Sequence, residues 1–162
     1  MSCKSNNKQK YPKAICVLNC SQLYFIDGAV SFTEYTNYVK VEVNLMGVPP
    51  GVRGFHIHEK GNLSEGCTSV CSHFNPHGAE HGGLNEPNSH LGDLGNLEAD
   101  SQGNIKKTFH AKRIRLTGEY SIIGRALVIH EKSDDLGKGG DPESKKTGNA
   151  GKRIACGVIG IN

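Results

Sequence analysis

Residues 38–45 alternate between polar and apolar side chains, and no other feature restricts the fold of this chain as strongly. Val39, Val41, Val43 and Leu45 take every second position, with Lys, Glu and Asn between them. Side chains two residues apart point to the same face of a strand, so the segment predicts a β-strand with one face in a core and the other in water. The period of 3.6 residues that an amphipathic helix needs is not sustained anywhere in the chain.

Several other short segments also predict strands. They cover residues 14–18, 28–32, 55–58, 95–99, 105–110, 114–116, 122–130 and 154–161. Residues 59–93 and 131–152 have no periodicity and are rich in glycine, which makes up 21 of the 162 residues. Long aperiodic segments are uncommon in a compact domain unless they are functional. About eight short strands with two long loops predict an antiparallel β-sandwich or barrel.

Length and charge limit the class of protein further. A chain of 162 residues is long enough for one domain with a substantial core. The net charge of +3 is small and its charges are scattered, which argues against a nucleic-acid partner. No apolar run reaches the ~20 residues of a membrane-spanning helix.

The beginning of the chain differs from the rest. Residues 1–13 hold four lysines and no acidic residue, which predicts a flexible basic tail ahead of a domain over residues 14–162. This segment lacks the apolar stretch of a signal peptide, so we expect a cytoplasmic protein without membrane contact. In that compartment six cysteines ordinarily indicate free thiols or metal ligands rather than disulfides.

Potential metal ligands are concentrated in one part of the chain. His56 and His58 lie two residues apart on a predicted strand, so both imidazoles leave the same face, although the pair alone could equally be a surface pair. Imidazole and carboxylate groups together suit zinc, and further candidates of these types follow. They are His73, His77, His81, His90 and Asp93 in the first long loop, and His130 at the end of a predicted strand.

Some common motifs are missing. The chain has no Cys-x-x-Cys pair, which disfavours a thiolate zinc site. It also has neither the Gly-x-x-x-x-Gly-Lys-Ser/Thr loop that binds phosphates nor the Gly-x-Ser-x-Gly turn of serine hydrolases.

The same residues stand in longer motifs that resemble those of the copper/zinc superoxide dismutases. The motifs are residues 54–59 (GFHIHE), 73–76 (HFNP), 81–83 (HGG), 90–96 (HLGDLGN), 124–131 (GRALVIHE) and 147–157 (TGNAGKRIACG). The resemblance runs from about residue 14 to residue 161. It implies an eight-stranded antiparallel Greek-key barrel, flattened like a sandwich, with two long functional loops.

The resemblance also implies two metal ions per chain. Copper would be bound by His56, His58, His73 and His130, and zinc by His73, His81, His90 and Asp93. His73 would then bridge the two ions as an imidazolate, and Asp134 would connect His56 to His81. The implied activity is the dismutation of superoxide to dioxygen and hydrogen peroxide, with copper cycling between oxidation states.

Other implied features concern substrate and partners. Arg153 would attract and position superoxide beside copper, and Glu143, Lys146 and Thr147 would form the channel rim. A disulfide would join Cys67 to Cys156. The family also implies a homodimer and, as a possible further partner, a copper chaperone.

The chain departs from the family pattern at a few positions. Cys71 replaces a small residue and could compete for Cys156, Lys60 replaces an aromatic residue near the dimer contact, and Pro142 replaces an acidic residue. His77 and His110 have no implied role. The rival hypotheses are a copper chaperone or metal store of the same fold, and a sandwich that only zinc stabilises, but both leave copper ligands or Arg153 unexplained.

Overall fold

The computed structural model describes residues 11–20 and 24–162. Over these residues the regular secondary structure consists of strands and one short helix. The strands are β1 (Lys13–Val17), β2 (Asn19–Cys20), β3 (Asp27–Glu34), β4 (Val39–Met46), β5 (Gly51–His58), β6 (Ser64–Cys67), β7 (Asp93–Ala99), β8 (Ile105–Ala111), β9 (Ala126–His130), β10 (Arg153–Val158) and β11 (Gly160–Ile161), and the helix is α1 (Ser144–Thr147).

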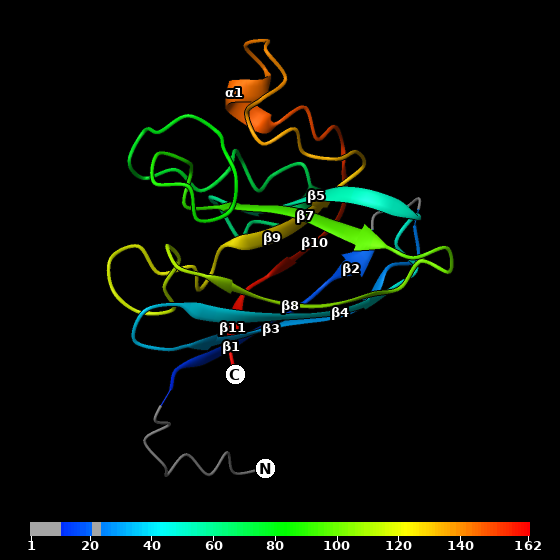
Figure 1. Ribbon diagram of the computed structural model, residues 1–162. Coiled ribbons are helices and arrows are strands. Elements are labelled where there is room, and N and C mark those ends of the chain that lie inside the picture. The colour runs from blue at the N-terminus through cyan, green and yellow to red at the C-terminus, as the bar shows by residue number, and fades with distance from the viewer. Residues whose placement is uncertain (1–10, 21–23) are drawn as a thin grey trace, which may run out of the picture.

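The strands form two antiparallel sheets that face one another (Figure 1). One sheet has the order β11-β1-β3-β4-β8 and the other the order β2-β10-β9-β5-β7. β4 and β8 are neighbours although β5 and β7, which lie between them in sequence, belong to the opposite sheet. That connection is of the Greek-key type. Strands of five or more residues number eight (β1, β3, β4, β5, β7, β8, β9 and β10), as the family resemblance implied, and they form two sheets rather than one closed ladder.

The core lies between the sheets and follows the alternation seen in the sequence. In β4, Val39, Val41, Val43 and Leu45 are buried, while the residues between them are partly or fully exposed. The predicted strand over residues 38–45 is therefore confirmed, and its apolar face packs against the opposite sheet.

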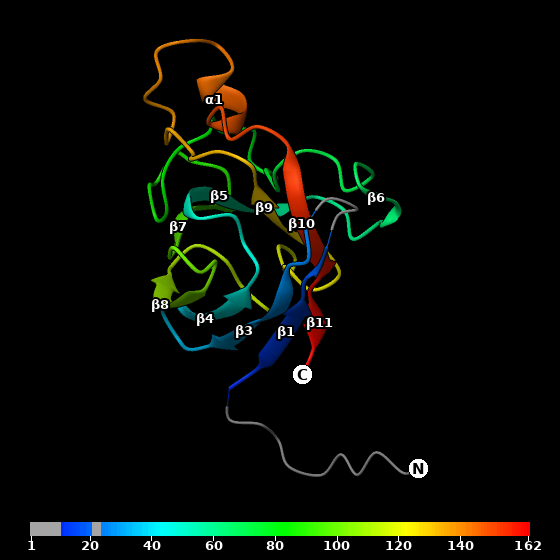
Figure 2. The ribbon, with the colours of Figure 1, turned by 90° about the vertical axis from the view of Figure 1, so that its right-hand side faces the viewer.

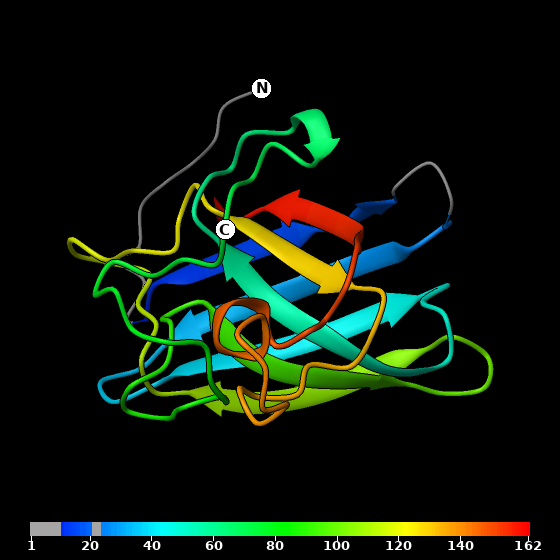
Figure 3. The ribbon, with the colours of Figure 1, turned by 90° about the horizontal axis from the view of Figure 1, so that it is seen from above.

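β5 and β9 do not alternate in burial, since every residue from Gly54 to His58 and from Ala126 to His130 is buried. Phe55 and Ile57 belong to the core cluster, whereas His56 and His58 point to the other face of β5. That face is covered by the long loops. Seen from above, α1 and its loop lie over β5 (Figure 3).

Two strand predictions are corrected. Residues 114–116 make only an isolated bridge, between Arg115 and Ser121. The strand predicted at residues 122–130 begins at Ala126, because Gly124 has φ of +80° and turns the chain just before it.

The ends of the domain also differ in detail from expectation. β1 begins at Lys13, which pairs with Thr33, while residues 1–10 of the expected tail lie outside the described residues. The first long loop, residues 59–93, contains β6. The second, residues 131–152, contains α1, which projects above the sheets (Figure 2). Among the described residues no helix is long and apolar enough to cross a lipid bilayer.

Candidate metal centre

Three backbone hydrogen bonds bring the histidine-rich loop onto β5. Ile57 N donates to Gly92 O (2.8 Å), Gly92 N donates to Phe74 O (2.9 Å), and Phe74 N donates to Ile57 O (2.8 Å). A Cβ atom at Gly92 would lie 2.1 Å from Ile57 O, so no other residue fits there without moving the backbone. This closed set of bonds places the histidines beside Ile57, Phe74 and Gly92 next to one another.

The first group of donors is made only of imidazoles. One ligand atom from each of four buried histidines lies within 4.8 Å of the others: His56, His58, His73 and His130. The Nε2 atoms of His58 and His130 are 3.3 Å apart. His56 Nδ1 and His73 Nε2 are buried and have no hydrogen-bond partner among the described residues. A buried polar atom without a partner is costly, and a metal ion at this point would satisfy both atoms.

The second group combines imidazoles with a carboxylate. Oδ1 of Asp93 lies 2.9 Å from His81 Nδ1, 3.0 Å from His73 Nδ1 and 3.3 Å from His90 Nδ1. His90 Nδ1 is 3.4 Å from His73 Nδ1. Ligands about 2.0–2.1 Å from a tetrahedral zinc ion are about 3.3 Å from one another, so these four donors have the spacing of a zinc site.

His56 also lies close to this group, since one ligand atom of each of His56, His73, His81 and Asp93 lies within 4.8 Å of the others. We assign His90 to this group, because its Nδ1 makes the short contacts and because His56 already belongs to the imidazole group. His73 belongs to both groups and offers a different ring nitrogen to each.

Asp134 connects the two groups through the Nε2 atoms of His56 and His81. Its Oδ2 lies 2.7 Å from His56 Nε2 and its Oδ1 lies 2.7 Å from His81 Nε2. Both rings are thus held with Nδ1 directed toward the donor groups. A Cβ atom at Gly148 would lie 2.0 Å from Asp134 Oδ1, so the close approach of the second loop requires glycine.

The electrostatics of the pocket favour neutral imidazoles in the first group. Burial lowers the pKa of His56, His58 and His73, and it lowers the pKa of His130 to about 4. A neutral imidazole is the form that binds metal. His81 differs: burial lowers its pKa, but hydrogen bonds to Asp134 and Asp93 outweigh burial and raise the pKa to about 9.

Asp93 stays ionised. Burial alone would raise its pKa, yet hydrogen bonds from the three facing imidazoles hold the pKa far below its usual range. Its second oxygen, Oδ2, accepts hydrogen bonds from Gly82 N and His90 N, both at 3.0 Å. The carboxylate is therefore fixed on both oxygens.

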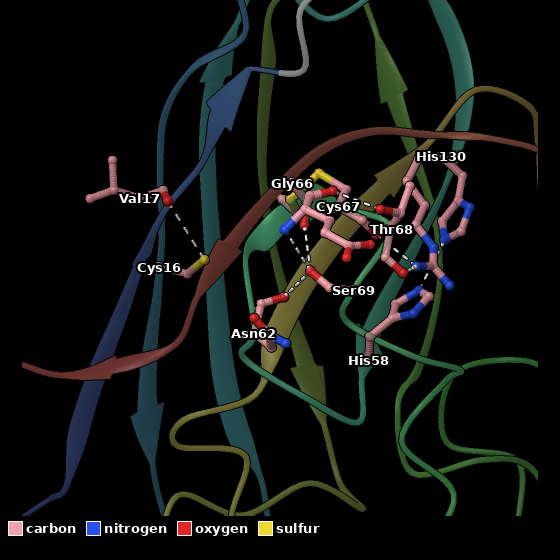
Figure 4. Close-up of a disulfide and its surroundings, with 12 residues drawn as sticks. Cys16, Val17, His58, Asn62, Gly66, Cys67, Thr68, Ser69 and His130 are labelled. Atoms are coloured by element: carbon pink, nitrogen blue, oxygen red, sulfur yellow. Dashed lines mark hydrogen bonds between the residues drawn. A yellow bond between two sulfur atoms is a disulfide. The ribbon is translucent and has the colours of Figure 1, made fainter.

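Arg153 is anchored next to the imidazole group. Its Nη1 donates to the carbonyl oxygens of Cys67 (2.7 Å) and Thr68 (3.1 Å), and its Nη2 donates to that of Cys71. Figure 4 shows the segment from Cys67 to Ser69 close to His58 and His130. Since backbone oxygens hold the guanidinium from one side, its place beside the metal donors is set by the loop.

A disulfide links that loop to the sheet. Cys67 is bonded to Cys156 of β10, as the family resemblance implied, and the expectation of free thiols from compartment alone is wrong for these two residues. Cys71 and Cys16 are free. Burial raises the pKa of the Cys16 thiol to about 12, so that thiol is inert.

An open cavity of about 1010 Å³ leads to the imidazole group. His58, His73 and His130 lie at its base together with Arg153, and Glu143, Lys146 and Thr147 line it as well. Among the charged residues that line the cavity, sequence reasoning gave no role to Glu80, Lys132 and Lys145. No local sequence pattern marks these residues, because their place in the cavity depends on how the two long loops fold over β5.

The remaining sequence candidates lie elsewhere. The His77 ring packs on Tyr120, with centroids 4.8 Å apart, and the His110 ring packs on Tyr38 at 4.3 Å. Neither joins the donor groups. Lys60 is exposed, and Pro142 lines the cavity next to Glu143.

The chemistry of the donors fits two metal ions of different kinds. The all-imidazole group suits copper, and three imidazoles with a carboxylate suit zinc. Fold and site together define a β-sandwich protein in which two neighbouring groups of potential metal ligands meet at His73. The chain belongs to the copper/zinc superoxide dismutase family. A family model described as "Copper/zinc superoxide dismutase (SODC)" matches residues 26–159.

Individual relatives agree. The chain is 50% identical over 157 residues to "Superoxide dismutase [Cu-Zn]" of Paramecium bursaria Chlorella virus 1, covering 96% of this chain and 82% of the relative. It is 54% identical over 138 residues to "Extracellular superoxide dismutase [Cu-Zn]" of Drosophila melanogaster, covering 84% and 76%. A solved structure described as "the clock protein EA4" superposes with a TM-score of 0.88 at 46% identity, covering 98% of this chain and 100% of the other.

Proposed function

We propose that this protein dismutates superoxide to dioxygen and hydrogen peroxide as an antioxidant enzyme. The observation that carries the proposal is the position of His73, whose Nδ1 belongs to one donor group and whose Nε2 belongs to the other. An imidazole shared by an all-imidazole site and a carboxylate-containing site is what the family's copper and zinc ions require.

The ligand roles follow from the two groups. His56, His58, His73 and His130 would hold copper, and His73, His81, His90 and Asp93 would hold zinc. Bound copper would supply one-electron exchange with the substrate, and bound zinc would supply positive charge without redox chemistry. Asp134 orients His56 and His81 so that each ring presents Nδ1.

His73 is also placed to hold and donate a proton. Its Nδ1 faces Asp93, while its Nε2 faces the imidazole group at the base of the cavity. Whenever Nε2 is not a ligand it can carry a proton, and that proton is placed to be given to the reduced product. The rings of His58 and His130 are each held by their Nδ1 atom, which hydrogen-bonds to Cys71 O in His58 and to Gly151 O in His130. Their Nε2 atoms are therefore held in position as metal ligands.

Arg153 is proposed to attract and position superoxide. Superoxide is a small anion, and a guanidinium at the base of a cavity focuses positive potential on it. Lys146 and Thr147 of α1, with Glu143 just before it, would shape the field at the rim. Thr147 Oγ1 donates to Glu143 Oε1 at 2.9 Å, which directs that carboxylate along the helix and supports this arrangement.

A homodimer is proposed through the surface of Gly61, Gly124 and Val158. A Cβ atom at Gly61 would touch Val158 Cγ1 at 3.1 Å, so these residues are contiguous. Val158 and Ile161 are exposed apolar side chains nearby, whereas Ile159 is buried and cannot contribute. Val158→Glu is expected to give a monomer in sedimentation equilibrium, and an unchanged mass would refute the proposed surface.

The compartment and the remaining partner are also proposals. A free, half-buried Cys71 thiol supports the cytoplasm, although a named relative is extracellular. Of the expected tail over residues 1–13, the part up to residue 10 is proposed to be dispensable, since Glu34 N donates to Pro12 O and Lys13 pairs with Thr33 in β1. A copper chaperone is proposed because the copper donors are deeply buried. Cell fractionation tests the compartment, and the activity of a variant without the tail tests whether the tail is dispensable. Copper loading with and without a chelator tests the need for a chaperone.

The deciding experiment combines metal analysis with a superoxide decay assay on the full chain. About one copper and one zinc per chain with fast turnover supports the enzyme. Bound copper without turnover supports a metal store or chaperone instead, and zinc alone supports a purely structural role.

A further inference from the structure

The segment that carries His90 is clamped to the connection after β8. Asn85 Nδ2 donates to His110 O (3.0 Å), and Lys112 N donates to Asn85 Oδ1 (2.6 Å). Arg113 adds three contacts from a charged donor, because its Nη1 donates to Glu86 O (2.7 Å), to Ser89 O (2.8 Å) and to Ser89 Oγ (2.7 Å). The Arg113 guanidinium therefore hydrogen-bonds to both ends of the segment 86–89, at Glu86 and at Ser89.

The peptide group between Ser89 and His90 is held from two sides. Its carbonyl oxygen accepts from Arg113, and its N–H donates to Oδ2 of Asp93 at 3.0 Å. A cationic donor on the carbonyl polarises the peptide group and strengthens the hydrogen bond that its N–H makes. Asp93 then directs its other oxygen, Oδ1, to the three zinc-type imidazoles.

The contact is part-buried: Arg113 is half-buried, whereas Ser89 and His90 on the side of the site are buried. Ser89 is 2% exposed and His90 is 7% exposed. The cavity left between Arg113, Ser89, His90 and Asp93 is only about 10 Å³. That volume is at the lower limit for a single water, so the guanidinium packs closely against this side of the site.

We propose that Arg113 is a positioning residue for the zinc site, acting through the Ser89–His90 peptide group on both His90 and Asp93. The inference rests on the proposed function, because it assigns these two residues to zinc. Arg113 touches neither the substrate nor a metal. Its effect is on the geometry and the zinc affinity of the donor group.

Arg115 provides a matched control. It lies two residues away on the same connection, and its Nη1 donates to the carbonyl oxygens of Lys112 and Ile114, within its own segment. Arg113→Met and Arg115→Met each remove one guanidinium bound to backbone carbonyls. Only the first removes a bond to the loop of His90.

The test measures zinc itself. Copper- and zinc-loaded wild type and variants are titrated with a chromophoric chelator, and the absorption of Co²⁺ placed in the zinc site is recorded. Partners of metal ligands change affinity by about 10–100-fold, so we expect about tenfold weaker zinc binding and a changed Co²⁺ spectrum for Arg113→Met. Arg115→Met should stay within about twofold of wild type.

Arg113→Lys separates positioning from a general loss of structure. The three acceptors converge on one nitrogen, so an ammonium can replace part of the contact. We expect zinc affinity between those of wild type and Arg113→Met, and this variant carries the test if Arg113→Met does not fold. Equal zinc affinity and Co²⁺ spectra for the Arg113 and Arg115 variants would overturn the inference. A wild type that takes up no zinc would instead refute the proposed function.

Discussion

The Arg153 guanidinium donates a hydrogen bond of 2.5 Å to the carbonyl oxygen of Cys71. The same oxygen lies 2.7 Å from His58 Nδ1, which leaves His58 Nε2 for the imidazole donor group. A single backbone oxygen therefore positions both a proposed copper ligand and the proposed substrate-binding cation. Both are expected to respond to changes in this loop.

Arg153→Ala is expected to retain both metals and to slow superoxide decay about tenfold at low ionic strength, because focused positive potential raises the encounter rate with an anion. The salt dependence should become weaker as well. The measurement is superoxide decay at several ionic strengths, with metal content as a control. Wild-type kinetics would rule out the role of Arg153.

Cys71→Gly should give a more stable protein than Cys71→Ala, by about 0.5–1 kcal/mol. Cys71 has φ of +64°, a conformation that costs an L side chain about 1 kcal/mol and that glycine adopts freely. The hydrogen bonds to Arg153 and His58 use the backbone and are kept in both variants. Denaturant unfolding measures the difference, and a less stable glycine variant would contradict the argument.

Cys67→Ser is expected to destabilise the protein by about 4 kcal/mol, since the disulfide closes a loop with a sequence separation of 89. It should also slow turnover, because Arg153 Nη1 donates to Cys67 O and the loop would loosen. Equilibrium unfolding and activity are measured beside Cys71→Ser, which leaves the disulfide intact. Equal stabilities of the two variants would count against the prediction.

Asp134→Asn should weaken zinc binding by about 10–100-fold, because an amide cannot accept from both His56 and His81. Asp135→Asn is the matched control. The neighbouring Asp135 bonds to Ser144 and Asn149 rather than to a histidine. Chelator competition on both variants provides the comparison, and equal zinc affinities would show that Asp134 does not orient the ligands.

The metal-free protein should be most stable near neutral pH. Burial lowers the pKa of folded His130 to about 4, below the unfolded value of about 6.5, so its share of stability is lost as pH falls from 6.5 toward 4. His81 acts in the opposite sense: its folded pKa of about 9 gives stability below pH 6.5 that is lost as pH rises through 9. Unfolding midpoints from pH 4 to 10 test this, and a flat profile would refute it.

Local patterns in the sequence predicted the strands well. The alternation of Val39, Val41 and Val43 depends only on neighbours along one strand, and β4 formed as expected. Segment ends were less predictable, since Gly124 turns the chain before β9 and residues 114–116 found no full strand partner. Where a strand begins and ends depends on the strand it pairs with, and a local sequence pattern does not contain that information.

The sequence by itself determined the strand pattern, the two long loops and the types of donor available to a metal. Motif resemblance added the family and the disulfide between Cys67 and Cys156, which spacing alone left open. Only the tertiary structure decided how close His56, His73 and His130 lie and that Arg113 holds the peptide group before His90. It also supplied the 2.7 Å distances from Asp134 to His56 and His81, a connection that the resemblance had implied. These contacts join residues far apart in the chain, and their distances follow from sheet register and loop packing, which no local pattern encodes.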